Sequence, residues 1–346
     1  MKKLWAIIVC LSVCLLSACD EGEKKELYMY IWSEYIPERV IEKFEKETGI
    51  KVFVSTYDTS ESMFTKVKMT NGTGYDLAMA TIGYMVTLKE QGYLQPFDKS
   101  KIPAFANYDE KYVNPEYDPD NKYSMPFAVG TTSFAVNAQN VDLSKLQSLS
   151  DLGRPEFDDR VLLLNDMRAV IGIGLKMKGY SINDTDENHI REAFEILKAK
   201  IIPNVKTYDT EATVQALLNG EVDIAQCWNG IAYQAASENN DIKYVFLKEG
   251  GDSWSDNFVL FKNAKNVDAA HQFINFILRP DISKDIFSEF PYTNPNKLGR
   301  ELLPPEIAHS PILYPDDKIV AEQEFKGYVG DALIYYDKYW NKLRVY

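Results

Sequence analysis

Histidine is scarce in this sequence, which has only His189, His271 and His309 among its 346 residues. The sequence also contains no H-E-x-x-H motif, no phosphate-binding P-loop, no G-x-S-x-G motif and no cysteine pair at metal-binding spacing. These absences argue against the commonest hydrolases, nucleotide enzymes and metal sites. We therefore expect a protein that binds its ligand without catalysis, cofactor or metal ion.

The chain has no excess of positive charge. Its 38 lysine and arginine residues are outnumbered by 51 aspartate and glutamate residues, which gives a formal net charge of −13. Such a protein is not expected to bind nucleic acid or an anionic membrane surface. Its acidity is compatible with a cationic ligand, although acidity also serves solubility alone.

The N-terminus has the pattern of a signal peptide. Two lysines precede the almost wholly apolar run 4–16, which is shorter than a membrane span. The segment closes with "LSAC", in which Cys19 follows a leucine at −3 and two small residues. This resembles the lipobox of bacterial lipoproteins, which implies removal of residues 1–18 and a lipid on the Cys19 sulfur. The alternative is an ordinary secretory signal with a cysteine at that place by chance.

Cysteine chemistry is then almost absent from the mature protein. Cys10 and Cys14 leave with the signal peptide, Cys19 carries lipid, and Cys227 remains as a single free thiol, so there is no disulfide framework. Residues 19–26 are mostly charged, and we expect them to form a short tether.

Strands and helices alternate along the rest of the chain, whose length suits two domains. In the first unit the expected strands are 27–32, 50–57 and 75–81, with an amphipathic helix after each of the first two. The order β-α-β-α-β predicts a parallel sheet with right-handed crossovers.

The same order restarts near residue 160, after an apolar β-like run at 125–137 that can carry the chain from one unit to the other. The expected strands here are 160–166, 205–208, 222–228 and 242–247, and the expected helices are 167–178, 187–200, one near 214–218 and one near 267–277. We expect an α/β protein of two lobes, each completed by a later segment. The predicted lobes are 27–134 with 258–313, and 135–257 with 314–346.

Unusual side chains gather at the expected strand ends, where open parallel sheets bind ligands. Three of the four tryptophans that follow the signal peptide stand at such places, together with isolated carboxylates. The residues are Trp32, Ser33, Tyr35, Thr81, Tyr84, Asp166, Thr210, Trp228, Trp254 and Asp256.

Aromatic rings combined with isolated carboxylates are typical of a site for an organic cation. A ring face attracts an ammonium group by about 0.5–2 kcal/mol and covers methylene groups at about 0.8 kcal/mol each. A carboxylate in a dry site pairs strongly with ammonium. A single tryptophan at a strand end is more often part of the core, and a single aspartate more often caps a helix. The prediction therefore depends on the whole set.

A series of short stretches, in this order, resembles the spermidine/putrescine-binding proteins, the receptors of polyamine ABC transporters. They include "YIWSEYIP", "FEKETGIKV", "YDLAMATIGYM", "YSMPFAVGTT", "VLLLNDMRAV", "NGEVDIAQCWNG", "KEGGDSWSDNFVLF", "FINFILRPDIS", "YTNPN" and "LYPDD". The resemblance covers about residues 27–346. It implies a type II periplasmic-binding-protein fold, in which two α/β lobes joined by a crossing hinge close on a ligand between them.

The resemblance also implies roles for individual residues. Trp32, Tyr35 and Ser33 match the first aromatic cluster of the family's pocket, Thr81 a hydroxyl after the third strand, and Asp166 an acid that holds a terminal ammonium. Further wall and charge positions are matched by Thr210, Trp228, Trp254, Asp256 and Tyr292.

Three positions depart from the family pattern. Ala169 stands where members often have glutamate, Lys326 where spermidine binders have glutamine, and Gly83 where an aromatic or acidic residue is expected, with Tyr84 beside it. Fewer acids and one added cation predict that putrescine, with two charges, binds better than spermidine, with three.

The same departures leave two alternatives open. The first is a receptor for another small cationic or zwitterionic solute, such as an amino acid derivative, whose carboxylate Arg168 or Lys326 would hold. The second is a surface lipoprotein without a transport role. For the main hypothesis we expect a monomer in the periplasm or at the cell surface, anchored only through Cys19, that docks on an ABC permease.

Overall fold

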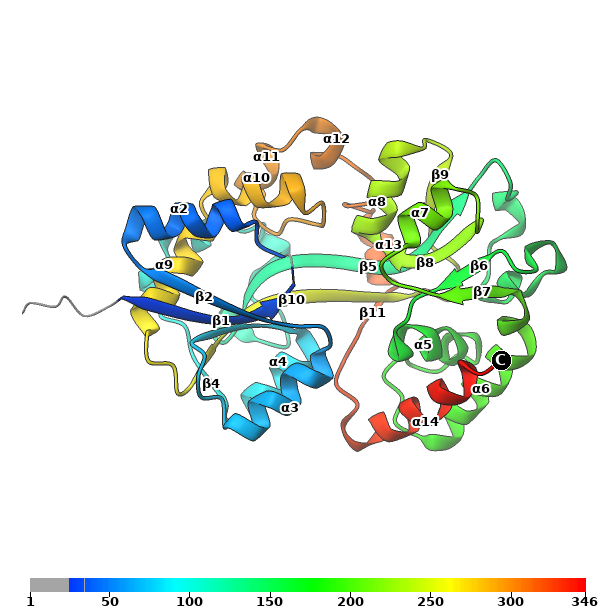
Figure 1. Ribbon diagram of the computed structural model, residues 1–346, viewed down its shortest axis with the longest axis horizontal. Coiled ribbons are helices and arrows are strands. Elements are labelled where there is room, and N and C mark those ends of the chain that lie inside the picture. Colours follow the sequence, from blue (N-terminus) through cyan, green and yellow to red (C-terminus); the bar gives the residue numbers. More distant parts are fainter. Residues whose placement is uncertain (1–24, 34) are drawn as a thin grey trace, which may run out of the picture.

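Two strands run through the whole molecule and join its two lobes. The computed structural model describes residues 25–33 and 35–346. In it, β5 (Met125–Asn137) and β10 (Asp252–Phe261) extend from one lobe into the other (Figure 1). The two-lobed α/β architecture expected from the sequence is confirmed. The signal peptide and Cys19 lie outside the described residues, and of the predicted tether only its last two residues are described.

Lobe 1 is built on three parallel strands, as the sequence predicted. Strand β1 (Glu26–Trp32) pairs with β2 (Lys51–Tyr57) and β3 (Leu77–Thr81). Helices α2 (Glu38–Thr48) and α3 (Ser60–Thr70) lie between these strands, and α4 (Ile82–Glu90) follows β3. Helix α2 buries Val40 and Phe44 and ends at Gly49, whose φ of 71° is the left-handed conformation that glycine adopts at low cost.

Lobe 2 repeats this plan with shorter strands. Strand β6 (Val161–Leu163) pairs in parallel with β7 (Val205–Tyr208) and β8 (Ile224–Trp228), and β9 (Ile242–Val245) pairs with β5. Its helices are α5 (Met167–Met177), α6 (Glu187–Lys200), α7 (Thr213–Leu218) and α8 (Asn229–Glu238).

All the strands belong to one hydrogen-bonded sheet of order β2-β1-β3-β10-β5-β8-β6-β7. Short strands β4 (Leu94–Gln95) and β11 (Glu324–Phe325) pair with β10. Because β10 is antiparallel to both β3 and β5, the end of β3 at Thr81 lies opposite Asp256, while the end of β8 at Trp228 lies opposite Thr132. The carboxyl ends of strands from both lobes thus meet the middle of the crossing strands.

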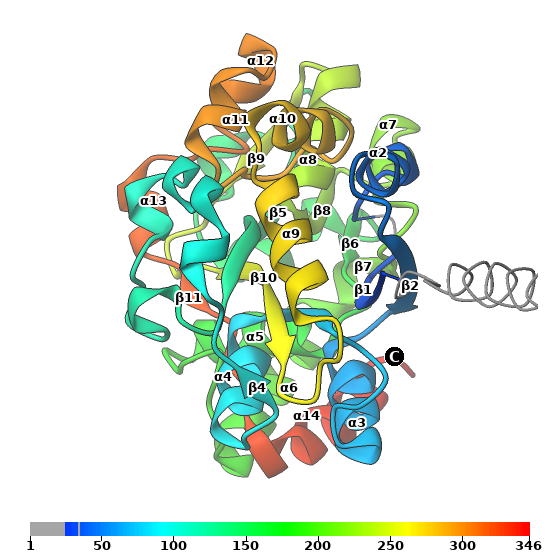
Figure 2. The same ribbon diagram turned by 90° about the vertical axis from the view of Figure 1, so that its left-hand side faces the viewer.

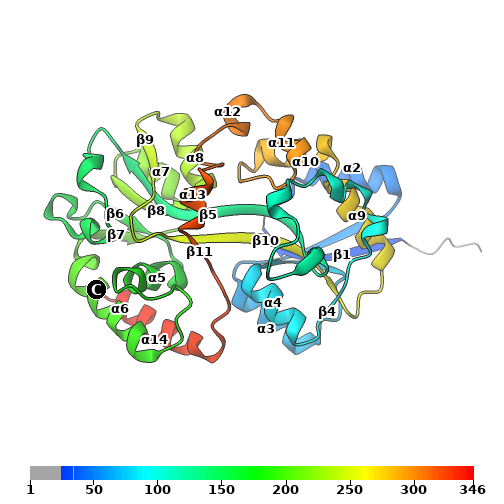
Figure 3. The ribbon, with the colours of Figure 1, turned by 180° about the vertical axis from the view of Figure 1, so that it is seen from behind.

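Segments from the end of the chain complete both lobes. Helices α9 (Val267–Ile277), α10 (Pro280–Glu289), α11 (Lys297–Glu301) and α12 (Pro305–Ala308) pack on lobe 1, and α14 (Leu333–Leu343) packs on lobe 2 (Figure 1). Figure 2 shows α9 in front of the crossing strands. Helix α13 (Asp317–Ala321) leads into β11, which pairs with β10 (Figure 3). Short 3-10 helices occupy much of 99–121 and 143–157, and two more lie at 202–204 and 330–332.

Helices cover both faces of the sheet in each lobe, which gives four buried apolar clusters (Figure 1). One cluster contains residues from Leu27 to Leu313, and another contains residues from Phe134 to Leu343. The chain boundaries between the lobes lie within β5 and β10, so the predicted divisions at 134/135 and 257/258 stay predictions. Within the described part of the chain, every helix is too short or too polar to cross a bilayer.

A buried aspartate ties the start of lobe 1 to the end of β10. Asp76 is 2% exposed and accepts hydrogen bonds from the backbone N–H groups of Tyr28, Lys265 and Asn266, each at 2.9 Å. The side-chain amide of Asn266 adds a fourth at 3.0 Å. One carboxylate thus bonds to a backbone segment 190 residues further along the chain.

We predict that Asp76→Ala lowers the free energy of unfolding by about 3 kcal/mol, because it leaves three backbone N–H groups without their acceptor. Urea unfolding followed by circular dichroism measures the change. The control is Asp317→Ala, which removes an acid that is 85% exposed and should cost less than about 0.5 kcal/mol. Equal small losses in the two variants would contradict the role of Asp76.

Candidate functional site

Alternate residues of β10 place two acids and a tryptophan on one face of the sheet. Side chains two apart in a strand point the same way, so Asp252, Trp254 and Asp256 share a face. All three are less than 9% exposed. On the neighbouring strand β5, Thr132 lies opposite Asp252 and Gly130 lies opposite Trp254.

Asp256 is a buried acid with a free oxygen atom. It is 2% exposed, and its Oδ2 accepts a hydrogen bond of 2.8 Å from the Tyr35 hydroxyl. Its Oδ1 has no partner within residues 25–33 and 35–346. Burial raises the pKa of Asp256 to about 6, although Tyr35, Trp32 and Lys326 act in the opposite direction. The carboxylate therefore gains from any donor or cation that reaches Oδ1.

A continuous series of aromatic rings leads to this acid. Neighbouring ring centroids are 6.2 Å apart for Trp32 and Tyr35, 4.5 Å for Tyr35 and Phe290, 4.4 Å for Phe290 and Tyr292, and 5.3 Å for Tyr292 and Trp254. The series joins the end of β1 in lobe 1 to the middle of β10. Such a wall suits the methylene groups and charged ends of an alkyl ammonium ion.

Two glycines make room for two of the rings. A Cβ atom on Gly130 would lie 2.1 Å from the Trp254 ring, and one on Gly230 would lie 2.6 Å from the Tyr292 ring. Real side chains do not approach so closely, so both rings keep these positions only while the opposing residue is glycine. The indole N–H groups of Trp32 and Trp254 are buried and have no partner among the described residues.

Beyond Trp254, a lysine bridges two further acids. Lys326 Nζ lies 3.2 Å from Asp166 Oδ2 and 3.1 Å from Asp252 Oδ2. The exposed fractions of the three side chains are 22% for Lys326, 32% for Asp166 and 6% for Asp252. Burial alone would lower the pKa of Lys326, but the two carboxylates raise it above its ordinary value. Lys326 is therefore a cation at this position.

Asp166 serves two purposes at once. It caps α5 by accepting hydrogen bonds from the N–H groups of Arg168 (2.8 Å) and Ala169 (3.0 Å), and it pairs with Lys326. Burial alone would raise the pKa of Asp166, but Lys326 and these backbone donors lower it. Asp166 therefore caps α5 and pairs with an internal cation, while its predicted role toward a ligand ammonium group stays a prediction.

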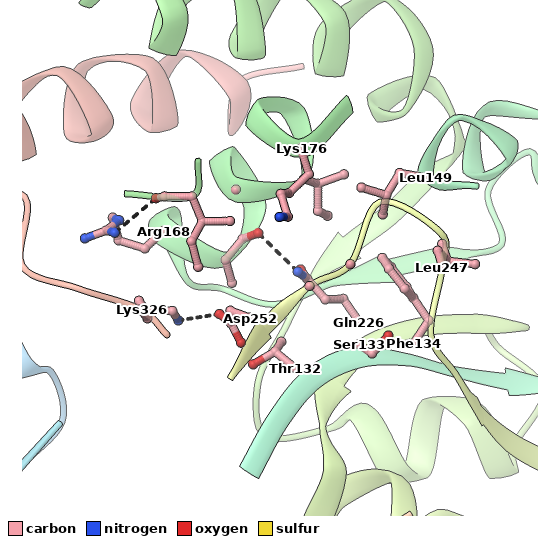
Figure 4. Close-up of a pocket in the computed structure, with 16 residues that line it drawn as sticks. Thr132, Ser133, Phe134, Leu149, Arg168, Lys176, Gln226, Leu247, Asp252 and Lys326 are labelled. Carbon is pink, nitrogen blue, oxygen red and sulfur yellow. Dashed lines mark hydrogen bonds and ion pairs between the residues drawn. The ribbon is translucent and has the colours of Figure 1, made fainter. Parts of the chain in front are cut away.

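A pocket in lobe 2 lies directly behind this ion pair. It is formed between α5 and strands β5 and β10, and Figure 4 shows Lys326 and Asp252 pointing toward each other at its edge. Its lining combines polar groups with small and apolar side chains. Among these are Thr132, Ala169, Gly172, Ile173, Asp252 and Lys326.

Some predicted site residues lie elsewhere. Tyr84 packs on Phe64 and Tyr328, and its hydroxyl donates to Glu61 at 2.8 Å. Ser33 is exposed, and Thr210 follows β7 without a hydrogen bond or ring contact to the other predicted residues in the part of the chain described. The structure thus does not bring these three together with Asp256.

The remaining predicted residues stand close to the aromatic wall or to the ion pair. Trp228, at the end of β8, packs against the large cluster of lobe 1, and Thr81 lies opposite Asp256. Lys326, whose direction the sequence left open, points to Asp166 and Asp252. Sequence reasoning missed Asp252 and Thr132. The alternation of β10, continued back from Trp254 and Asp256 by two residues, would have found Asp252.

Arg168 is occupied by the fold. Its guanidinium donates to the carbonyl oxygen atoms of Gly327 (3.0 Å) and Ile182 (3.2 Å) and to Asn183 Oδ1 (3.0 Å), and it lies 4.8 Å from the ring centroid of Tyr336. The Arg168 guanidinium therefore points to these groups, and Lys326 is the cation that pairs with Asp166 and Asp252.

Comparison with known proteins identifies the family. Residues 39–313 match the model of the bacterial extracellular solute-binding proteins. The chain belongs to this family. It is 38% identical over 329 residues to the spermidine/putrescine-binding periplasmic protein of Salmonella typhimurium, covering 95% of this chain and 94% of that protein.

Solved structures of solute-binding proteins agree with this assignment. A spermidine/putrescine ABC transporter protein of Listeria monocytogenes has a TM-score of 0.84 and 36% identity, covering 93% of this chain and 99% of its own. The TpPotD lipoprotein of Treponema pallidum has a TM-score of 0.80 and 26% identity, with 93% and 100% covered. The type II periplasmic-binding-protein fold and the family resemblance are both confirmed.

The raised pKa of Asp256 predicts a cost to the ligand-free protein. The folded state binds this proton more tightly than the unfolded state, whose pKa is near 3.8, so stability falls as the pH rises from about 4 to about 7. We predict that Asp256→Asn raises the free energy of unfolding by about 2 kcal/mol at pH 8 and changes it little at pH 4. Urea unfolding of ligand-free protein at both pH values measures this.

A buried acid with the opposite shift provides the control. Although burial opposes it, hydrogen bonds from Arg160 and Asn140 lower the pKa of Asp223. Asp223→Asn should therefore destabilise the protein at pH 8. A difference between wild type and Asp256→Asn that is the same at pH 4 and pH 8 would contradict the prediction.

Proposed function

We propose that this solute-binding protein captures a polyamine, with putrescine favoured over spermidine, and delivers it to an ABC permease. The observation that carries the proposal is the free Oδ1 of Asp256 at the end of a wall of aromatic rings. A buried carboxylate with an unused oxygen requires a donor, and the rings select a cationic donor on an alkyl chain. The names of the related proteins support the same ligand class.

The charges near the wall favour a dication. Among the described residues, the acids of this region are Asp166, Asp252 and Asp256, and the cation that lies among them is Lys326. The three carboxylates exceed Lys326 by two charges, which suits a dication, and the Arg168 guanidinium beside them adds positive charge that opposes a third ammonium group. Spermidine would bring a third ammonium group, and Ala169 offers it no carboxylate.

The zwitterion alternative has less support. Arg168 is held by three oxygen atoms of the fold, and Lys326 already contacts two carboxylates. A ligand carboxylate beside Lys326 would also lie beside Asp166 and Asp252 and be repelled by them. A ligand carboxylate beside Arg168 would meet a guanidinium that already donates to three oxygen atoms. The ring wall likewise argues against a surface lipoprotein without a small ligand.

The mechanism that we propose follows the two-lobed architecture and involves no chemical step. Ligand enters between lobes 27–134 with 258–313 and 135–257 with 314–346. Contacts of the ligand with aromatic rings of the first lobe and with acids of the second then favour the closed arrangement, which is a shift of population driven by ligand binding. The closed monomer docks on the permease.

Isothermal titration calorimetry of ligand-stripped protein tests the proposal. We predict that putrescine binds at least about ten-fold more tightly than spermidine, because the third ammonium group of spermidine lacks a counter-charge. Butane-1,4-diol, which has the same chain without charge, should give no saturable heat. Equal or tighter binding of spermidine would disprove the preference. Absence of binding by both polyamines would disprove the ligand class, and mass spectrometry of co-purified solutes would then identify the true ligand.

We further propose that a lipid on Cys19 keeps the receptor at an extracytoplasmic membrane surface. The "LSAC" sequence supports this, as does the description of the Treponema relative as a lipoprotein. Cys19→Ser should move the protein from the membrane fraction to the soluble fraction and abolish incorporation of labelled palmitate. Cys14→Ser, a matched change within the signal peptide, should do neither. Labelled, membrane-bound Cys19→Ser protein would contradict the anchor.

A further inference from the structure

Lys326 holds two acids at once, and one of them has capacity left. Asp252 contacts Lys326 through Oδ2, while its Oδ1 is buried without a hydrogen-bond partner in the described chain. Thr132 Oγ1 is also buried without a hydrogen-bond partner in the described chain. Thr132 and Asp252 are directly opposite each other on β5 and β10, and both line the lobe 2 pocket beside Lys326 (Figure 4). Two unused acceptors thus lie next to a cation.

We propose that Asp252 is a positioning residue that makes Lys326 an exchangeable internal cation. This inference rests on the proposed function. Without ligand, Lys326 neutralises both Asp166 and Asp252. When a ligand ammonium group pairs with Asp166, the Lys326 ammonium withdraws to Asp252 and the Thr132 hydroxyl, and remains paired.

The surroundings allow this exchange to be confined to one side chain. The backbone of Lys326 is fixed because its N–H donates to Ser253 O at 3.1 Å, next to the β10–β11 pairing. The pocket beside it is lined by Ala169 and Gly172, which leave room near the lysine chain. The backbone therefore stays in place while the ammonium group moves.

Asp252 determines how much the exchange costs. A buried ammonium group that loses its only carboxylate is strongly unfavourable. With Asp252 present, Lys326 keeps one carboxylate and gains free acceptors, so the ligand competes for Asp166 alone. Without Asp252, a ligand that pairs with Asp166 would leave the Lys326 ammonium group without any carboxylate partner. Asp252 thus favours diamine binding through Lys326, without contact with the ligand.

A double-mutant cycle tests this directly. Binding of putrescine is measured by calorimetry at pH 7.5 for wild type, Asp252→Asn, Lys326→Gln and the double variant. We expect Asp252→Asn to weaken binding at least ten-fold in the wild-type background and less than three-fold in the Lys326→Gln background. Lys326→Gln should also narrow the preference for putrescine over spermidine. Equal effects of Asp252→Asn in both backgrounds would overturn the inference.

A second cycle and a control complete the experiment. Thr132→Val, which removes only the hydroxyl, should weaken putrescine binding about two- to five-fold with Lys326 present and not at all with Lys326→Gln. Asp317→Asn, which changes an 85% exposed acid that does not line the pocket, should leave binding unchanged. Thermal melts establish that each variant is folded. If wild type binds neither polyamine, the proposed function fails and the inference with it; if wild type binds putrescine without coupling, the inference alone fails.

Discussion

The antiparallel pairing of β5 with β10 is the interaction on which the rest of the structure depends. Both strands are buried along almost their whole length and continue from one lobe into the other, so their hydrogen bonds belong to both lobes. The same register sets Thr132 against Asp252 and Gly130 against Trp254. A slip of one residue would turn every one of these side chains to the other face. The connection between lobes and the candidate site therefore have one structural basis.

The pairing of β5 with β10 also gathers polar atoms without hydrogen-bond partners at the centre of the molecule. Free buried atoms include Asp256 Oδ1, Asp252 Oδ1 and the indole N–H groups of Trp32 and Trp254, within the described residues. Each such group costs about 1–3 kcal/mol if it stays unpaired. An ammonium ligand donates to the carboxylates but has no lone pair for the indoles. The Trp32 indole lies close enough to Asp256 to lower the pKa of that acid, whereas the Trp254 N–H needs another acceptor, such as water.

The alternation of strands and helices could be predicted from the sequence, but the directions in which individual side chains point could not. Trp254 and Asp256 were found because they lie just before and within the β-like run "SDNFVLF" (255–261), but Asp252 was missed because it lies outside that run. Tyr84 was placed at the site because it follows β3, yet it lies in the first turn of α4 and is turned toward α3. The direction of Lys326 depends on pairing between β11 and β10, some 70 residues apart, which no local pattern shows.

The short segment 326–329 links the charge of the site to the packing of both lobes. Gly327 lies against Gly83 of lobe 1 so closely that a Cβ on Gly83 would be 2.5 Å from its carbonyl carbon. Tyr328 packs its ring among aromatic residues of α3 and α4 in lobe 1, while the last residue of the segment belongs to the core of lobe 2. Lys326 is therefore only one and two residues along the chain from Gly327 and Tyr328, which make the contacts between lobes. The backbone that presents the lysine occupies the space that a side chain at position 83 would need, so this path of segment 326–329 requires glycine at position 83.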